Sequence, residues 1–188
     1  RSGAKEHDLL VCTGDLGAAY MGLQILEREK EVYNANPSIQ PDLAGHDYIV
    51  ERQLKPEARI DIVKFLKELD VVPSSMIDIS DGLASEIMHL CKSSKVGCHV
   101  YNEKIPIDTT TSMTAIEFNV DPVTCALNGG EDYELLFTIP QKDYDKIKGN
   151  PHMTIIGHMT NKDDGMYLMD NNGSAIELRA QGWNHFEH

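Results

Sequence analysis

One stretch of the chain, residues 56–93, alternates between helical and strand-like patterns and narrows the folds available to it. In residues 56–69 one face of a helix is apolar, formed by Ala58, Ile62, Phe65, Leu66 and Leu69. Pro56 is expected to open this helix, since proline is favoured in a first helical turn. Residues 71–79 indicate a buried strand, and residues 83–93 a second amphipathic helix. This succession predicts helices layered on a sheet.

The rest of the chain continues the alternation and adds hairpins. Further helices are predicted at residues 18–30, 48–54, 109–118 and 141–148. Further strands are predicted at residues 8–13, 97–101, 133–139 and 153–159, and a hairpin at 166–169 and 175–178. We therefore expect an α+β fold, in which a mixed sheet is flanked by helices in α/β layers.

Charge and composition exclude several classes of function. Of 188 residues, 41% are hydrophobic and 25% charged, which suits a globular domain. The formal net charge of −13 argues against nucleic acid as a partner, because phosphates need Lys and Arg to neutralise them, and against an anionic membrane surface. No apolar run approaches the roughly 20 residues of a membrane span. The cysteines lack Cys-x-x-Cys spacing, and a reducing cytoplasm fits them best.

The run Asp78-Ile79-Ser80-Asp81-Gly82-Leu83 follows the predicted buried strand and begins a helix. Two carboxylates three residues apart can converge on one Mg²⁺, which takes carboxylate, phosphate and water oxygens. The N–H groups at the helix start can also receive an anion. The alternative is a helix cap made by Ser80 or Asp81, which the spacing alone favours. Capping does not account for Asp78, which is expected to need a partner at the end of a buried strand.

A second candidate loop, Asn128-Gly129-Gly130-Glu131-Asp132-Tyr133-Glu134, combines two glycines with three acids before an apolar strand. The glycines permit backbone conformations and close approaches that other residues cannot make. A turn with solvated charges is the alternative, and the loop taken alone favours it. The turn Gly14-Asp15-Leu16-Gly17 matches neither a Rossmann nor a Walker pattern and is better interpreted as structural. Trp183, the single tryptophan, either packs the C-terminal segment or stacks on a flat ring.

In their order along the chain, these segments resemble thiamine-monophosphate kinases. Besides the two acidic loops, the matching runs are Arg1-Ser2-Gly3-Ala4-Lys5, Thr13-Gly14-Asp15-Leu16-Gly17, Leu54-Lys55-Pro56 with Arg59, and Gly182-Trp183-Asn184-His185-Phe186. The resemblance covers nearly the whole chain. It implies the fold of the C-terminal domain of aminoimidazole ribonucleotide synthetase-like proteins. This superfamily also includes selenophosphate synthetase and a hydrogenase maturation protein.

The resemblance also implies a domain organisation. Residues 1–188 are expected to form a single C-terminal domain of a longer two-domain enzyme, a view that the absence of an initiator Met before Arg1 favours. The N-terminal domain, absent from this chain, would carry further metal-binding and ATP-binding residues and form a homodimer. The isolated fragment would then be inactive.

The family transfers the γ-phosphoryl group of ATP to thiamine monophosphate, which gives thiamine diphosphate. The resemblance assigns six residues: Asp78 and Asp81 to Mg²⁺, Arg1 and Ser80 to ATP, and Glu131 and Trp183 to thiamine monophosphate. We expect direct in-line transfer without a catalytic side chain or phospho-enzyme, since phosphoryl transfer needs mainly positioning and neutralised charge. The alternatives are a sister activity of the aminoimidazole ribonucleotide synthetase or selenophosphate synthetase type, or a non-catalytic ligand-binding or assembly domain.

Overall fold

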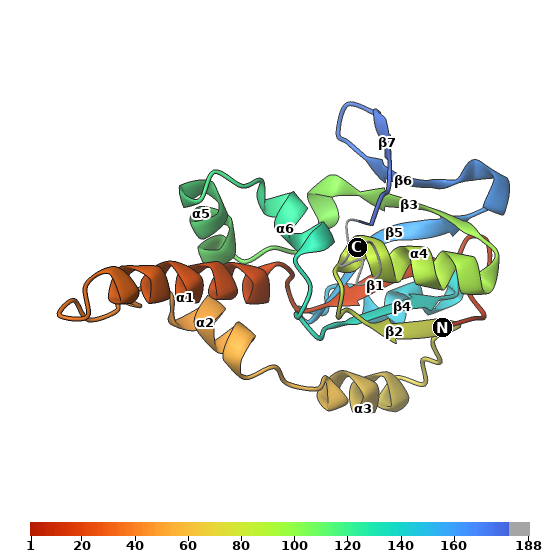
Figure 1. The fold of residues 1–188 in the computed structure, drawn as a ribbon. Helices are drawn as coiled ribbons and strands as arrows, with labels where there is room; N and C mark the ends of the chain where they lie inside the picture. The colour runs from red at the N-terminus through yellow and green to blue at the C-terminus, as the bar shows by residue number, and fades with distance from the viewer. Residues whose placement is uncertain (181–188) are drawn as a thin grey trace.

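The computed structural model describes residues 1–180, in which seven strands form one mixed sheet (Figure 1). The strands are β1 (Leu9–Thr13), β2 (Ser75–Asp78), β3 (Gly97–Tyr101), β4 (Leu135–Ile139), β5 (Met153–Thr160), β6 (Met166–Met169) and β7 (Ala175–Glu177). Their order in the sheet is β2-β4-β1-β5-β3-β6-β7. Neighbouring strands are antiparallel except for β3 and β6, which are parallel. The predicted mixed sheet is confirmed.

The helices of the described residues alternate with these strands along the chain. They are α1 (Ala18–Ala35), α2 (Asp47–Leu54), α3 (Ile60–Glu68), α4 (Leu83–Ser94), α5 (Thr109–Glu117), α6 (Pro122–Asn128) and α7 (Tyr144–Ile147). Short 3-10 turns lie at Asn102–Lys104, Gln141–Asp143 and Lys162–Asp164. None of these helices is both long enough and apolar enough to cross a membrane.

The two faces of the sheet bury different helices, because successive side chains of a strand point to opposite faces. On one face α4 packs through Leu83, Ile87 and Leu90 against β1, β4 and β5. On the other face α3 and α7 cover Val11, Phe137 and Ile139. A third apolar cluster joins α1, α2, α5 and α6, which are grouped to one side of the sheet (Figure 1).

Several element boundaries differ from the sequence-based prediction. The helix predicted from Pro56 begins only at Ile60, since residues 56–59 form the loop that carries Arg59 toward the sheet. Helix α6 was not predicted, although Asp121 accepts a bond from the Thr124 N–H at 2.9 Å and Pro122 follows it, which is a helix-start signal. The strand predicted from residue 133 begins at Leu135, because Tyr133 has a left-handed φ of 51°.

One end of the sheet gathers the loops that the sequence singled out. Strands β1 and β2 are both antiparallel to β4, which lies between them, so both end where β4 begins. Thr13, Asp78 and Glu134 therefore lie at the same end of the sheet. The following segments, residues 14–17 and 79–82, leave from this end, and residues 129–134 arrive there.

Candidate functional site

The two acidic loops are bound to each other through their backbones. The Ile79 N–H donates to the Glu134 carbonyl at 2.7 Å, and the Tyr133 N–H donates to the Ile79 carbonyl at 2.9 Å. The Glu131 N–H donates to the Ser80 carbonyl at 2.8 Å. These bonds continue the β2–β4 ladder into the loops. They bring the sequence-predicted residues of both loops together.

Two glycines allow this close approach of the loops. Gly130 has a φ of +70°, and a Cβ atom there would lie 2.6 Å from the Ser80 carbonyl oxygen. Gly82 has a φ of +106°, and a Cβ atom there would lie 2.6 Å from the Leu127 carbonyl oxygen. Any larger residue at either position would combine a strained backbone with a clash against backbone atoms. The glycines of both motifs are therefore packing requirements of the site.

Three carboxylates of the two loops are exposed and gather around Tyr133. Asp78, Asp81 and Glu131 are each exposed, and the Tyr133 hydroxyl donates to Glu131 Oε2 at 3.0 Å. The pKa of Tyr133 is raised, mainly by this bond to Glu131 and its charge, with smaller contributions from Asp78 and Asp81. All three carboxylates thus lie within electrostatic reach of one hydroxyl group. The sequence did not single out Tyr133, whose role depends on this spatial arrangement.

Backbone strain accompanies the same residues. Glu131 and Tyr133 have φ values of 62° and 51°, in the left-handed region that non-glycine residues seldom adopt. Such strain costs on the order of 1–3 kcal/mol per residue and persists where the surrounding structure enforces it. Here the backbone bonds to Ile79 and Ser80 enforce it. The loop therefore fixes the backbone of Glu131, from which its exposed side chain extends.

The structure contradicts the helix-cap interpretation of the first loop. Gly82 occupies the cap position of α4, and no side chain caps that position. Instead, the buried carboxylate of Glu86 accepts bonds from the Asp81 N–H at 3.0 Å and the Ser80 hydroxyl at 3.3 Å. The Asp81 side chain is left exposed. The expectation that Asp78 needs a buried partner is also wrong, because Asp78 is exposed at the strand end.

Arg1 is not gathered with the other predicted residues. It is exposed, and its carbonyl accepts a bond from the Ser94 hydroxyl at 3.5 Å. Ser94 ends α4, whereas Asp81 precedes its start, and a helix of this length spans about 18 Å. The backbone of Arg1 therefore lies at the opposite end of α4 from Asp78, Ser80 and Asp81. Trp183 lies outside the described residues.

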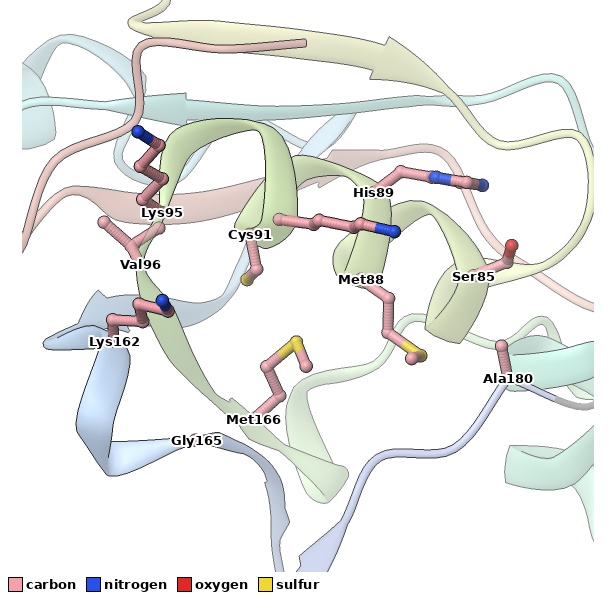
Figure 2. Close-up of a pocket in the computed structure, with 11 residues that line it drawn as sticks. Ser85, Met88, His89, Cys91, Lys95, Val96, Lys162, Gly165, Met166 and Ala180 are labelled. Atoms are coloured by element: carbon pink, nitrogen blue, oxygen red, sulfur yellow. The ribbon is translucent and has the colours of Figure 1, made fainter.

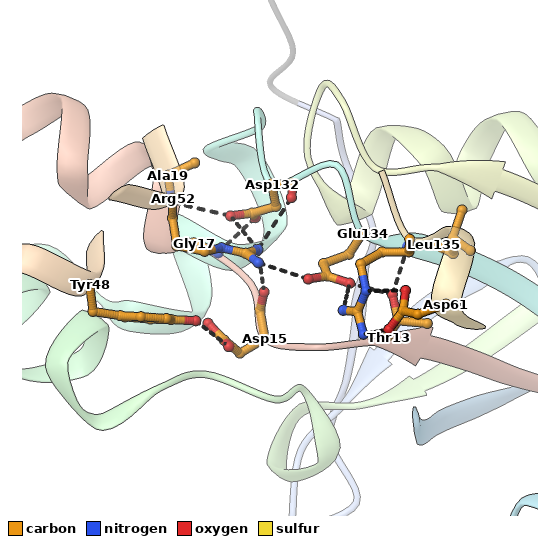
Figure 3. Close-up of polar contacts among 11 residues, drawn as sticks. Thr13, Asp15, Gly17, Ala19, Tyr48, Arg52, Asp61, Asp132, Glu134 and Leu135 are labelled. Atoms are coloured by element: carbon orange, nitrogen blue, oxygen red, sulfur yellow. Dashed lines mark hydrogen bonds and ion pairs between the residues drawn. The ribbon is translucent and has the colours of Figure 1, made fainter. Parts of the chain in front are cut away.

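The other two acids of the second loop are buried, so the interpretation of that loop as a turn with solvated charges is wrong for them. Glu134 is 1% exposed and binds Arg52 Nη1 at 2.8 Å (Figure 3). Arg59 Nη1 also binds Glu134, at 2.5 Å. The Thr13 hydroxyl also donates to Glu134. A Cβ atom at Gly14 would lie 2.3 Å from Glu134 Oε1, so this turn residue leaves room for the carboxylate. Two guanidinium groups and a hydroxyl compensate for the burial of this charge.

Asp132 caps helix α1, although the two are far apart in the sequence. Its carboxylate accepts bonds from the Gly17 N–H at 2.7 Å and the Ala19 N–H at 3.2 Å (Figure 3). Burial raises the pKa of Asp132 to about 6, against the lowering effect of these two N–H groups. Arg52 Nη2 donates to the Asp15 and Asp132 carbonyls, each at 3.2 Å. This agrees with the structural interpretation of the turn at residues 14–17.

The exposed acids offer part of a metal site. Among residues 1–180, Asp78 and Asp81 have no lysine or arginine within ion-pair distance, so their oxygens are free for a ligand. Two carboxylates suffice for Mg²⁺ when phosphate oxygens and water complete its shell. The described residues contain no group of three or more His, Cys, Asp or Glu side chains that could hold a metal ion. These donors fit Mg²⁺ that arrives with a phosphate ligand.

The fold is that of the aminoimidazole ribonucleotide synthetase-like proteins. A structure of hydrogenase maturation protein HypE in complex with ATP aligns with 97% of this chain and 53% of its own, with a TM-score of 0.68 and 15% identity, which shows the fold alone. No family model matches the chain.

The chain is related to thiamine-monophosphate kinases by sequence as well as by fold. It is 35% identical to the enzyme of Aquifex aeolicus and 33% identical to that of Escherichia coli K12, in each case over 99% of this chain and 54% of the relative. The structure of AaThiL complexed with AMPPCP and TMP aligns with a TM-score of 0.79 and 30% identity, over 98% of this chain and 53% of that one. The chain spans about half the length of the curated relatives it matches, corresponding to their C-terminal half.

Proposed function

We propose that this chain forms the C-terminal half of a kinase that transfers the γ-phosphoryl group of ATP to thiamine monophosphate. The observation that carries the proposal is the gathering of Asp78, Asp81 and Glu131, all exposed, around Tyr133. The match to thiamine-monophosphate kinases over 99% of the chain supports it. So does the binding of an ATP analogue and TMP by the similar protein AaThiL.

In this proposal Asp78 and Asp81 hold Mg²⁺ at the phosphates of ATP. Phosphate groups need positive charge around them, and the acidic loops of this chain, whose net charge is −13, do not provide it. The metal supplies that charge. The N–H groups at the start of α4 point toward the same end of the sheet, where a helix terminus favours phosphate. The Ser80 hydroxyl is a contact to ATP from the same loop. Backbone hydrogen bonds from the second loop to Ile79 and Ser80 hold this segment in place, so its groups are positioned before ligand binds.

The acceptor, thiamine monophosphate, is assigned to Glu131 and Trp183. The left-handed backbone and the Tyr133 bond hold Glu131 in place, so it can orient a cationic ring system by charge and hydrogen bonding. The acceptor's own phosphate oxygen attacks, so no protein nucleophile is needed and transfer is direct and in line. Arg1 is assigned to ATP through its guanidinium on a phosphate. Its backbone lies at the far end of α4 from Asp78 and Asp81, so this assignment rests on the resemblance alone.

The proposal extends to the whole enzyme. We propose that an N-terminal domain supplies further metal and ATP ligands and forms a homodimer, since the relatives have about as much chain again and Asp78 and Asp81 make only part of a metal shell. A cytoplasmic enzyme is supported by Cys12, Cys91, Cys98 and Cys125, which are free and buried.

The test is a chimera in which this chain replaces the C-terminal half of the Aquifex aeolicus kinase. Coupled ADP release should require both thiamine monophosphate and Mg²⁺. Acid quench during turnover should reveal no phosphorylated protein. Binding of AMPPCP serves as the control that the two halves assemble. A chimera that binds AMPPCP but releases ADP only with an aminoimidazole ribonucleotide precursor or selenide would assign the chain to a sister activity. One that binds AMPPCP and turns over nothing would favour the ligand-binding or assembly domain.

A further inference from the structure

A cavity of about 710 Å³ lies along the flank of α4, beside the Lys162–Asp164 turn and β6 (Figure 2). Known small-molecule sites have volumes of roughly 300–1,000 Å³. Lys95, Val96 and Lys162 lie at one end of the cavity, and Ser85 and Ala180 lie at the other (Figure 2). Lys95 follows Ser85 by ten positions, which corresponds to about 15 Å along α4 and its C-cap residue. The cavity is therefore large enough for an elongated molecule.

The walls of this cavity are apolar and adaptable. Met88 and Val96 line it from the α4 side, and Met166 lines it from β6. Cys91, which is 1% exposed, lies behind them as a packed thiol. Methionine side chains are flexible and polarisable, so they fit apolar groups of different shapes. The body of a ligand here would be a ring system or an alkyl chain.

The charge of the cavity opposes that of the chain. Lys92, Lys95 and Lys162 line it, and no Asp or Glu is among its described lining residues. Within residues 1–180 these three lysines form no ion pair, whereas the chain as a whole has a net charge of −13. Lysines that line a cavity with no carboxylate among its lining residues favour the binding of an anion there, although Asp163 and Asp164 follow Lys162 in the same turn. The acidic loops do not line this cavity, so the two sites are separate.

We propose that this cavity binds a small organic anion with an apolar body and a single carboxylate, phosphate or sulfonate head group. The head group lies between Lys95 and Lys162, and Lys92 also lines the cavity. The body extends along Met88 and Met166 toward Ser85. We expect tight binding to need both parts of the ligand. Exposed ion pairs contribute little affinity, so the head group alone binds weakly, and the apolar walls alone do not distinguish one neutral molecule from another. This inference does not depend on the proposed kinase activity.

The probe is anilinonaphthalene sulfonate, whose fluorescence rises in an apolar site and whose sulfonate supplies the head group. The wild-type chain should bind it at one saturable site. The triple variant Lys92→Gln, Lys95→Gln, Lys162→Gln should bind it about tenfold more weakly, from an about twofold loss per lysine. The matched variant Lys30→Gln, Lys64→Gln, Lys142→Gln has the same change in net charge on distant exposed lysines, and should bind like the wild type. Equal losses in both variants would overturn the proposal.

Three further measurements separate the sources of affinity. Neutral phenylnaphthylamine should bind about tenfold more weakly than the sulfonate, and inorganic phosphate should not displace the sulfonate. Displacement by phosphate alone would reduce the site to an ion site and contradict the proposal. The proposal would also be contradicted if the sulfonate bound only to a variant carrying Trp183→Ala and Phe186→Ala. In that case the chain's own C-terminal segment would be the occupant of the cavity. Urea unfolding midpoints equal to the wild type's will show that each variant is folded. Unchanged binding by a folded Lys92→Gln, Lys95→Gln, Lys162→Gln variant would contradict the proposal.

Discussion

Glu131 and Glu134 lie three residues apart in one loop, in opposite surroundings. Glu134 is 1% exposed, with two arginines and a threonine on its carboxylate. Glu131 is exposed, and among the described residues its side chain accepts a bond from Tyr133 alone. Asp132 belongs with Glu134, whereas Asp78 and Asp81 belong with Glu131. A run of acids is thus two groups: buried carboxylates that hold the fold and exposed ones available to a ligand.

Removing the charge of the buried group should have the largest effect on stability. Glu134→Gln removes the buried charge that Arg52 and Arg59 share, and breaking a buried pair costs about 3–5 kcal/mol. Asp61 at 3.2 Å from Arg59 and Asp132 at 3.9 Å from Arg52 remain, so we expect the lower end of this range. Urea unfolding followed by circular dichroism measures this loss. Glu131→Gln is the matched control and should change the free energy of unfolding by less than about 0.5 kcal/mol. Equal effects of the two substitutions would erase the distinction between the groups.

Asp132→Asn should be the next most damaging change. Asparagine keeps one acceptor oxygen, so either the Gly17 or the Ala19 N–H at the start of α1 loses its partner. Loss of a helix cap costs about 0.5–2 kcal/mol. Amide hydrogen exchange at Gly17 and Ala19 should rise more than exchange in α4. Uniform exchange changes across both helices would argue against a local capping role.

The same residue predicts a pH dependence. Burial raises the pKa of Asp132 to about 6, above its ordinary value, so the folded state binds this proton more tightly than the unfolded state. Its contribution to stability is therefore fully present below the ordinary pKa of about 3.9 and is lost as the pH rises through 6. The stability difference between wild type and Asp132→Asn should grow on acidification from pH 7 to 4. A difference that is flat over this range would contradict the raised pKa.

Tyr133→Phe should have the smallest effect and should separate positioning from folding. The change removes the bond to Glu131 at 3.0 Å and nothing from the core. One such bond contributes about 0.5–1.5 kcal/mol, so the KM of the chimera for thiamine monophosphate should rise roughly three- to tenfold with kcat nearly unchanged. The unfolding midpoint should stay at the wild-type value. A matching loss of stability would make Tyr133 a structural residue.

Helices and strands with a clear local sequence pattern were predicted correctly. The strand at Gly97–Tyr101 and the helix begun by Leu83 appear where predicted, and the mixed sheet with its helical layers is confirmed. The start of α3 was missed because the apolar helical spacing extends back through Ala58, while the pairing of Arg59 with Glu134, 75 residues away, keeps residues 56–59 out of the helix. The spacing of apolar residues along the chain gives no information about a contact between such distant residues.

The site was only partly predictable for the same reason. The sequence marked both acidic loops, but it could not separate Glu131 from Glu134, since burial depends on Arg52, which is 82 residues away. The capping alternative for Asp81 was reasonable by spacing but wrong, because Gly82 occupies the cap position of α4 and no side chain caps it. The roles of the exposed residues remain predictions.

The most direct test of the account is ADP release by the chimera carrying Asp81→Asn, with the unfolding midpoint measured on the same sample. Asp81 is exposed and caps no helix, so the substitution should leave the midpoint unchanged. The rate with thiamine monophosphate and saturating Mg²⁺ should fall at least about 100-fold, since a charge that positions the transferring phosphate is lost. A near-normal rate in a folded variant would show that Asp81 binds no metal and would contradict the account.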